Sequence, residues 1–176
     1  EKFIVEMQNA SQTYFMLIGM LGGIGNSMIL GNFDSTFAAH PEMALYIPLI
    51  GGTGGNVGTQ SSALVVQGLA NSSLNAENTF KQVLKESVVA LINATIISML
   101  VYIYNFIRFG ATATVSYSVS ISLFAVVMFA SIFGTLVPMT LEKLKIDPAI
   151  ATGPFISITN DIIGMMMYMG ITVLLS

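Results

Sequence analysis

The chain has 176 residues, of which 54 % are hydrophobic and only 9 % are charged, and its mean hydropathy is +0.79. In soluble domains about a quarter of all residues are charged, so this composition is that of a protein embedded in a lipid bilayer. The net charge of −3 comes without any basic patch, which excludes nucleic acid as a partner. The sequence has no cysteine, which excludes disulfides and zinc–thiolate sites.

Residues 1–12 place apolar side chains at helical spacing, with charged side chains between them. This pattern indicates the end of an amphipathic helix at the membrane face, although a frayed terminus would explain it equally well. The chain begins with Glu1 and lacks the features of a signal peptide, so we expect it to be a fragment of a longer protein.

Five runs of apolar residues are each long enough for a bilayer-spanning helix of about 20 residues. They are residues 14–33, 46–70, 83–107, 119–141 and 148–176. The charged residues within them are Lys85 and Glu86 near the start of the third run and Asp161 inside the last run. The runs are continuously apolar rather than alternating in polarity, which disfavours a transmembrane barrel. The sequence therefore predicts an all-α, polytopic membrane protein with five transmembrane helices in one domain, residues 13–176.

The lysine and arginine residues of the connections predict the orientation, because short basic loops are retained in the cytoplasm. With the N-terminus inside, the cytoplasmic segments hold Lys2, Lys81, Lys85, Lys143 and Lys145, and the outer segments hold only one basic residue, an arginine. We therefore expect a multi-pass protein of the plasma (inner) membrane, with a cytoplasmic N-terminus and the C-terminus outside.

Asp161 is the main candidate for ion binding. It lies 13 residues after Pro148 and 15 before Ser176, roughly 20 Å from either end of a helix and close to mid-membrane. A mid-span aspartate costs about 3 kcal/mol to insert, so such residues usually face a cavity and serve an ion, a proton or a partner charge. Apart from Lys85 near the start of the third run, no basic residue lies in any predicted span, which favours a cation from outside the chain. A protonated Asp161 bonded to a neighbouring helix is the structural alternative.

The helical face of Asp161 and one stripe of the second span carry mostly small side chains. Residues at helical spacing from Asp161 are Gly153, Ser157, Gly164 and Tyr168. The stripe in the second span comprises Gly52, Gly55, Asn56, Thr59 and Ala63. Small residues of this kind suit a narrow ion path, and they suit close helix packing as well.

The second span also contains five glycines within eight residues, which weaken a helix and would expose backbone carbonyls. Carbonyl, amide and carboxylate oxygens are ligands for hard cations. Mg²⁺ keeps several of its waters and accepts only one or two carboxylates, so a path with one carboxylate per chain suits it.

The two stretches GGTGGNVGTQSSALVVQGLA and DPAIATGPFISITNDIIG together resemble the paired signature of the MgtE magnesium channels and their animal solute-carrier relatives. The resemblance covers residues 14–176. It implies a homodimer with a pore at the dimer interface, on the two-fold axis, lined by the second and fifth helices of each chain.

On this resemblance Asp161 matches the pore aspartate, which would hold a largely hydrated Mg²⁺ through its waters. Ser157 matches a position whose backbone carbonyl helps to hold the ion. Gly52, Gly55 and Thr59 match the stripe of the second helix that lines the pore. Bacterial members often have asparagine at Thr59, threonine at Ala63 and asparagine at Gly153, so the polar lining here is thinner. The resemblance also implies cytoplasmic magnesium-sensing domains, which are missing from this sequence.

The leading hypothesis is a protein that conducts Mg²⁺ down its electrochemical gradient and has no enzyme activity and no cofactor beyond the transported ion. The expected metal-binding residues are Asp161, Ser157, Gly52, Gly55, Asn56 and Thr59. One alternative is an exchanger coupled to H⁺ or Na⁺ with Asp161 as the coupling carboxylate. A second alternative is a membrane anchor that assembles a larger complex, in which the glycines serve only helix contacts.

Overall fold

The computed structural model describes residues 2–110, 113–151 and 153–176, and for residues 2–11, 76 and 151 it describes the backbone alone. Every secondary-structure element in these ranges is a helix, which confirms the all-α prediction for the described residues. The elements are α1 (Lys2–Gly31), α2 (Asp34–Ala39), η1 (Pro41–Tyr46), α3 (Ile47–Ala70), η2 (Ala76–Asn78), α4 (Thr79–Phe109), α5 (Thr114–Lys143), η3 (Pro148–Ala151) and α6 (Pro154–Leu175).

Four helices are long and apolar enough to cross a membrane: the Gln12–Gly31 part of α1, and the whole of α4, α5 and α6. These helices coincide with four of the five predicted spans. The remaining span forms α3, whose 24 residues include six glycines and several amide and hydroxyl side chains. Its length is that of a spanning helix, but because of its polar groups and glycines it is not among the helices that are apolar enough to cross a membrane.

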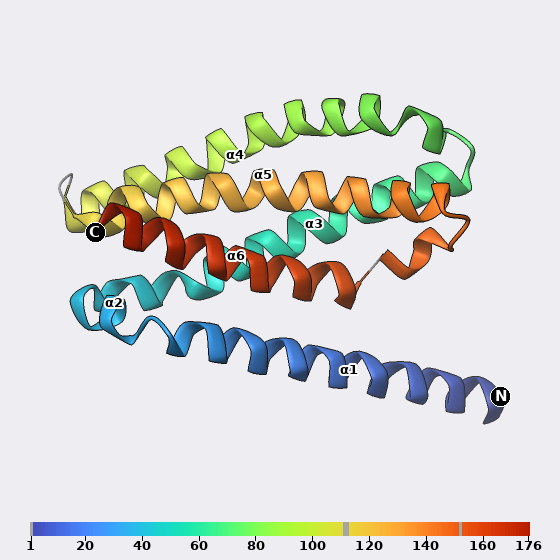
Figure 1. The fold of residues 1–176 in the computed structure, drawn as a ribbon, viewed down its shortest axis with the longest axis horizontal. Coiled ribbons are helices and arrows are strands. Elements are labelled where there is room, and N and C mark those ends of the chain that lie inside the picture. Colours follow the sequence, from blue (N-terminus) through green and yellow to red (C-terminus); the bar gives the residue numbers. More distant parts are fainter. Residues whose placement is uncertain (1, 111–112, 152) are drawn as a thin grey trace.

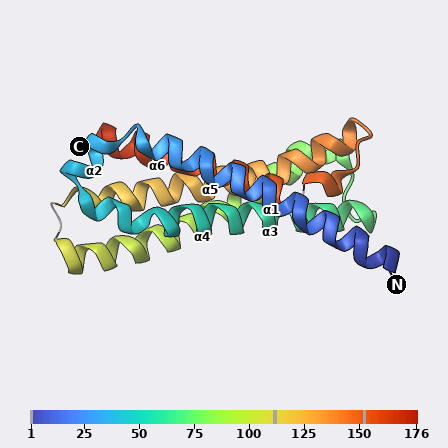
Figure 2. The ribbon, with the colours of Figure 1, turned by 90° about the horizontal axis from the view of Figure 1, so that it is seen from below.

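The long helices run along one common direction, with α5 in the middle of the bundle (Figure 1). Helix α5 packs against α3, α4 and α6, and α3 also packs against α6. Helix α1 lies along the edge of the bundle, where its one close neighbour among the described long helices is α6 (Figure 2). Helix α3 runs lengthwise through the same bundle as the four apolar helices (Figure 1).

The hydrophobic core lies near the junction of η1 with α3, where the first half of α5 meets the second half of α6. Two buried tyrosines join the short helix η1 to this core. The Tyr168 hydroxyl on α6 donates a hydrogen bond to the Met43 carbonyl at 2.8 Å, and the Tyr46 hydroxyl donates to Asn105 Oδ1 on α4. These bonds satisfy polar groups that lipid could not satisfy, and they fix the loop end of α3.

Helix α3 approaches α5 and α6 so closely that glycine is required at the contacts. A Cβ atom added at Gly134 of α5 would overlap the backbone carbonyl of Gly58, and one added at Gly58 would overlap the Asn160 side chain of α6. A Cβ atom at Gly54 would lie 2.9 Å from Val126 Cγ1. The glycines of the second span therefore do serve close helix packing.

Two predicted boundaries differ from the structure. Residues 110–118 form a polar stretch that suggests a connection before a span at residue 119, but α5 already begins at Thr114. Its early turns hold because Ser116 Oγ donates to the Gly110 carbonyl and Ser118 Oγ bonds Thr172 Oγ1 at 2.8 Å. At the other end of the chain, α1 continues without a break from Lys2 into the first span. The predicted amphipathic pattern of residues 1–12 lies almost entirely in side chains outside the described residues.

The contact between Gly58 and Gly134 predicts a specific stability effect. The substitution Gly134→Ala should destabilise the protein by about 1–3 kcal/mol, because the added methyl group forces two helix backbones apart. Gly170→Ala on α6 is the matched control, since a Cβ atom there meets nothing within 4 Å. Thermal unfolding of the two variants in detergent, followed by circular dichroism, measures the difference. Equal unfolding temperatures would show that the α3–α5 contact is looser than described.

Candidate functional site

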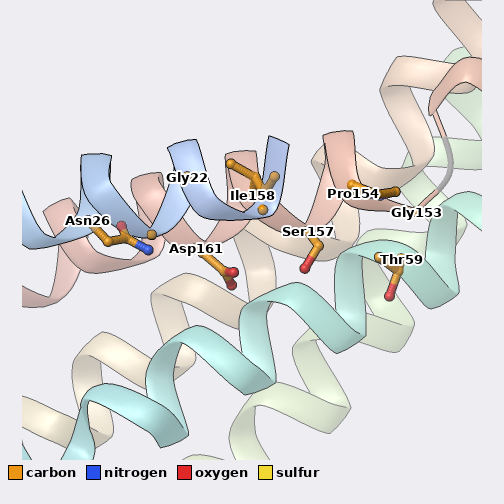
Figure 3. Close-up of a pocket in the computed structure, with 10 residues that line it drawn as sticks. Gly22, Asn26, Thr59, Gly153, Pro154, Ser157, Ile158 and Asp161 are labelled. Atoms are coloured by element: carbon orange, nitrogen blue, oxygen red, sulfur yellow. The ribbon is translucent and has the colours of Figure 1, made fainter. Parts of the chain in front are cut away.

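A cavity of about 490 Å³ lies where α1, α3 and α6 meet. Asp161 and Ser157 contribute to it from α6, Thr59 contributes from α3, and small or amide residues line the side of α1. Figure 3 shows the Asp161 and Ser157 side chains projecting from α6 on the side that faces α3. The cavity therefore gathers oxygen-bearing side chains from segments about 100 residues apart in the sequence.

A second cavity of about 210 Å³ adjoins Asp161 and Ser157 on the side of the α2–η1 connection. Its wall on α3 consists of Ile47, Pro48, Gly51, Gly52, Gly55 and Asn56. All six residues predicted to bind the metal thus line one or both of these cavities: Gly52, Gly55, Asn56, Thr59, Ser157 and Asp161.

Gly55 is the point where α3 comes nearest to the acidic side chain. A Cβ atom there would lie 2.9 Å from Ser157 Oγ and 3.1 Å from Asp161 Oδ1. At Gly51, one turn earlier, a Cβ atom would lie 3.7 Å from Asp161 Oδ1. The absence of side chains at these two positions therefore leaves the carboxylate free to face α3.

The expectation that the glycines open the backbone of α3 is wrong. Helix α3 is continuous from Ile47 to Ala70. The Thr59 hydroxyl donates to the Gly55 carbonyl at 2.8 Å and to the Asn56 carbonyl at 3.1 Å, which adds hydrogen bonds in the region where carbonyls were expected to be exposed. Packing against α5 and α6 outweighs the low helix propensity of glycine.

Asp161 stands nearer to one end of its helix than the sequence predicts. Residues 148–151 form η3 rather than part of the span, and α6 begins only at Pro154. Asp161 is therefore about 10 Å from the start of α6 and about 21 Å from Leu175 at 1.5 Å per residue. The positive φ of Gly153, +67°, allows the chain to turn into α6 at this point.

The carboxylate of Asp161 has no cationic partner in the described part of the chain, where the one ion pair within 4.0 Å joins His40 and Glu42. The described residues also contain no group of three or more histidine, aspartate or glutamate side chains that could hold a metal. Asp161 is thus the single acidic side chain among the residues that line this cavity.

The other residues on the predicted face of Asp161 have different surroundings. Gly153 lines the larger cavity, but Gly164 and Tyr168 turn away from it into the bundle. A Cβ atom at Gly164 would contact Val126 of α5 at 3.4 Å. Only the first half of this face therefore contributes to the cavity, and the second half is core.

Asn26 of α1 is a cavity residue that the sequence analysis missed. It lines both cavities, opposite the α6 side chains, and its buried Oδ1 has no hydrogen-bond partner among the described residues. The signal was present in the sequence, because Gly19, Gly22 and Asn26 follow one helical stripe in a span that is otherwise apolar. An uncompensated buried amide oxygen is costly in lipid unless water or an ion reaches it.

Comparisons with known proteins identify the family. Residues 47–171 match the family model of the MgtE divalent cation transporter. The magnesium transporter MgtE of Bacillus subtilis is 33 % identical over 156 residues, which cover 89 % of this chain and 34 % of that protein. The magnesium transporter MgtE of Thermus thermophilus is 31 % identical over 161 residues, which cover 92 % of this chain and 35 % of that protein. The chain thus spans about a third of the length of these relatives. It belongs to the MgtE family of divalent cation transporters.

Proposed function

We propose that this chain conducts Mg²⁺ across a membrane and that the ion passes the cavity at Asp161. The observation that carries the proposal is a carboxylate with no cationic partner among the described residues, set in a cavity with hydroxyl and amide groups on three helices. The relatives described above are magnesium transporters, which supports Mg²⁺ as the ion.

The size of the cavity supports an ion that retains its water shell. Six waters at about 30 Å³ each occupy roughly 180 Å³, and the cavity holds about 490 Å³. Mg²⁺ dehydrates reluctantly and binds through one or two carboxylates while keeping several waters. Asp161 would then accept hydrogen bonds from the waters, and Ser157, Gly52, Gly55, Asn56 and Thr59 would shape the path around the hydrated ion.

We further propose that α3 is the fifth transmembrane helix. Its 24 residues span about 36 Å at 1.5 Å per residue, more than the roughly 30 Å of a bilayer core. It runs beside the four apolar helices, and it must return the chain from the end of α1 to the start of α4 (Figure 1). Many of its polar residues face cavities or other protein groups, where they are tolerated, and those on its exposed face need a cover other than lipid.

A second copy of the chain is the proposed cover for the free face of α3. Gly52, Asn56, Gln60 and Gln67 are exposed there, at spacings that place them on one side of the helix. Exposed α4 residues such as Leu84, Ile92 and Leu100 suit lipid, but amide side chains do not. Two copies related by a two-fold axis would bring their α3 and α6 helices together and place both Asp161 carboxylates beside one path.

The proposed direction of transport follows from the orientation of the chain. With five lysines on the N-terminal side and only one arginine on the other, the N-terminus is cytoplasmic and the C-terminus is outside. The inside-negative potential then drives Mg²⁺ inward with about 2.3 kcal/mol per charge per 100 mV.

The first test is Mg²⁺ uptake into liposomes that contain the purified chain, with an imposed potential and no opposing ion gradient. Asp161→Asn should lower uptake by about 10- to 100-fold, the range found when groups that hold a metal through its outer shell are removed. Asp34→Asn, which removes an exposed carboxylate outside the cavities, is the matched control and should leave uptake unchanged.

The two alternative functions give different results in the same assay. Uptake that appears only when an opposing H⁺ or Na⁺ gradient is added would favour the coupled exchanger. Uptake that is equal in the wild type and Asp161→Asn would remove the carboxylate from the mechanism and leave the membrane anchor as the better account.

A second test uses the close approach at Gly55. The variant Gly55→Ala should displace the Asp161 side chain from its rotamer, which costs about 0.5–1.5 kcal/mol and corresponds to roughly 2- to 10-fold weaker uptake. Gly31→Ala at the end of α1 adds the same methyl group where nothing lies within 4 Å, and should transport normally. If Gly55→Ala transports as the wild type does, the ion path does not depend on the position of Asp161 against α3.

A further inference from the structure

Three residues line both of the cavities beside α6: Asn26 of α1, and Ser157 and Asp161 of α6. On α1, Gly19 lines only the larger cavity and Leu30 lines only the smaller one, and Asn26 lies between them in the sequence. The two cavities therefore follow one another along α1 and meet at Asn26. This junction of Asn26, Ser157 and Asp161 is the waist of the site.

The other two helices show the same order along the bundle. Helix α3 runs in the opposite direction to α1 and α6 (Figure 1). Its earlier residue Gly51 lines the smaller cavity, and its later residue Thr59 lines the larger one. On α6, Pro154 lines the larger cavity and Met165 lines the smaller one. A path that joins the two cavities therefore runs past the waist.

Close contact with α6 fixes the place at which α1 presents Asn26. A Cβ atom at Gly22, one turn before Asn26, would lie 2.5 Å from Ile158 Cγ2 of α6. A Cβ atom at Gly25 would lie 3.7 Å from Ile162 Cδ1. The Asn26 side chain projects from α1 into the same cavity as the Asp161 side chain (Figure 3). The lack of a side chain at Gly22 thus holds the Asn26 amide close to α6.

Asn26 differs from its neighbours on α1. Ile24 and Met28 are 50 % and 71 % exposed, as suits contact with lipid. Asn26 Oδ1 is buried and has no hydrogen-bond partner among the described residues. An amide oxygen in this state costs about 1–3 kcal/mol unless a water supplies the missing donor. The terminal torsion of asparagine is broad, so the amide can turn its oxygen toward the waist.

The waist combines a charged acceptor with a neutral one. Waters bound to Mg²⁺ direct their hydrogens outward, so the hydrated ion needs acceptors around it. Asp161 supplies carboxylate oxygens and Asn26 supplies an amide oxygen without a second charge. This combination matters because a conducted ion must bind strongly enough to enter and weakly enough to leave.

We propose that Asn26 is an ion-binding residue of the path. Its amide oxygen accepts a hydrogen bond from a water of the hydrated Mg²⁺, while Asp161 holds the waters on the side of α6. Helix α1 then forms a third wall of the path beside α3 and α6. The inference rests on the proposed conduction past Asp161 and adds a binding group from a helix on which neither the sequence nor the family resemblance places one.

The test measures the Mg²⁺ concentration that gives half-maximal uptake into liposomes, a quantity that does not depend on how much of the protein is folded. Asn26→Leu keeps the size of the side chain and removes the acceptor, so it should raise this concentration about 10-fold. Asn26→Asp keeps the acceptor and adds a charge, so its half-saturating concentration should equal or fall below that of the wild type. Asn32→Leu, at an exposed asparagine just beyond α1 that lines neither cavity, is the control and should match the wild type.

A wild-type half-saturating concentration in Asn26→Leu would overturn the proposal, and so would an equal rise in Asn26→Leu and Asn26→Asp, which would indicate a packing role. Asp161→Asn in the same assay separates the two claims. If uptake falls in Asp161→Asn but Asn26→Leu behaves as the wild type, only the role of Asn26 fails. If both variants behave as the wild type, conduction past Asp161 fails as well. Should Asn26→Leu not fold, Asn26→Ala removes the same oxygen without added apolar bulk and should show the same rise.

Discussion

The close approach of α3 to α5 and α6 is the constraint on which the rest of the structure depends. At Gly58 and Gly134 the backbones of α3 and α5 are in contact. At Gly55 the backbone of α3 lies against Asp161 and Ser157 of α6. No side chain larger than hydrogen fits at these points without a shift. The contact holds α3 as a regular helix despite its six glycines and brings it within reach of the only acidic residue of α6.

This position gives α3 polar surroundings on two sides. One side lines the cavity of Asp161, and on another side the Ser61 hydroxyl donates a hydrogen bond to the Glu86 carboxylate of α4. A helix with polar groups on both sides cannot have the hydropathy of a lipid-facing span, which is why α3 alone among the long helices falls outside the apolar group. The helix that is least suited to lipid is therefore the one whose polar groups line the cavities between the helices.

Much of the fold follows from the sequence, because most of the charged residues lie between the long apolar runs that form the helices. All six predicted site residues line the two cavities. The sequence could not locate the start of α6, since Gly153 and η3 depend on local turn geometry, and it could not show that Thr59 reinforces the backbone of α3. Asn26 was missed because the α3 and α6 residues that share its cavities become its neighbours only through packing.

The most direct measurement of the central claim is anomalous diffraction from crystals of the chain grown with Mn²⁺. The account predicts a dimer with a Mn²⁺ peak on its two-fold axis between the two Asp161 carboxylates. The peak should lie about 4–5 Å from each carboxylate, a distance that one metal-bound water accounts for. A structure without a peak at this position, or one in which Asp161 bonds protein groups at the end of a closed cavity, would contradict the account.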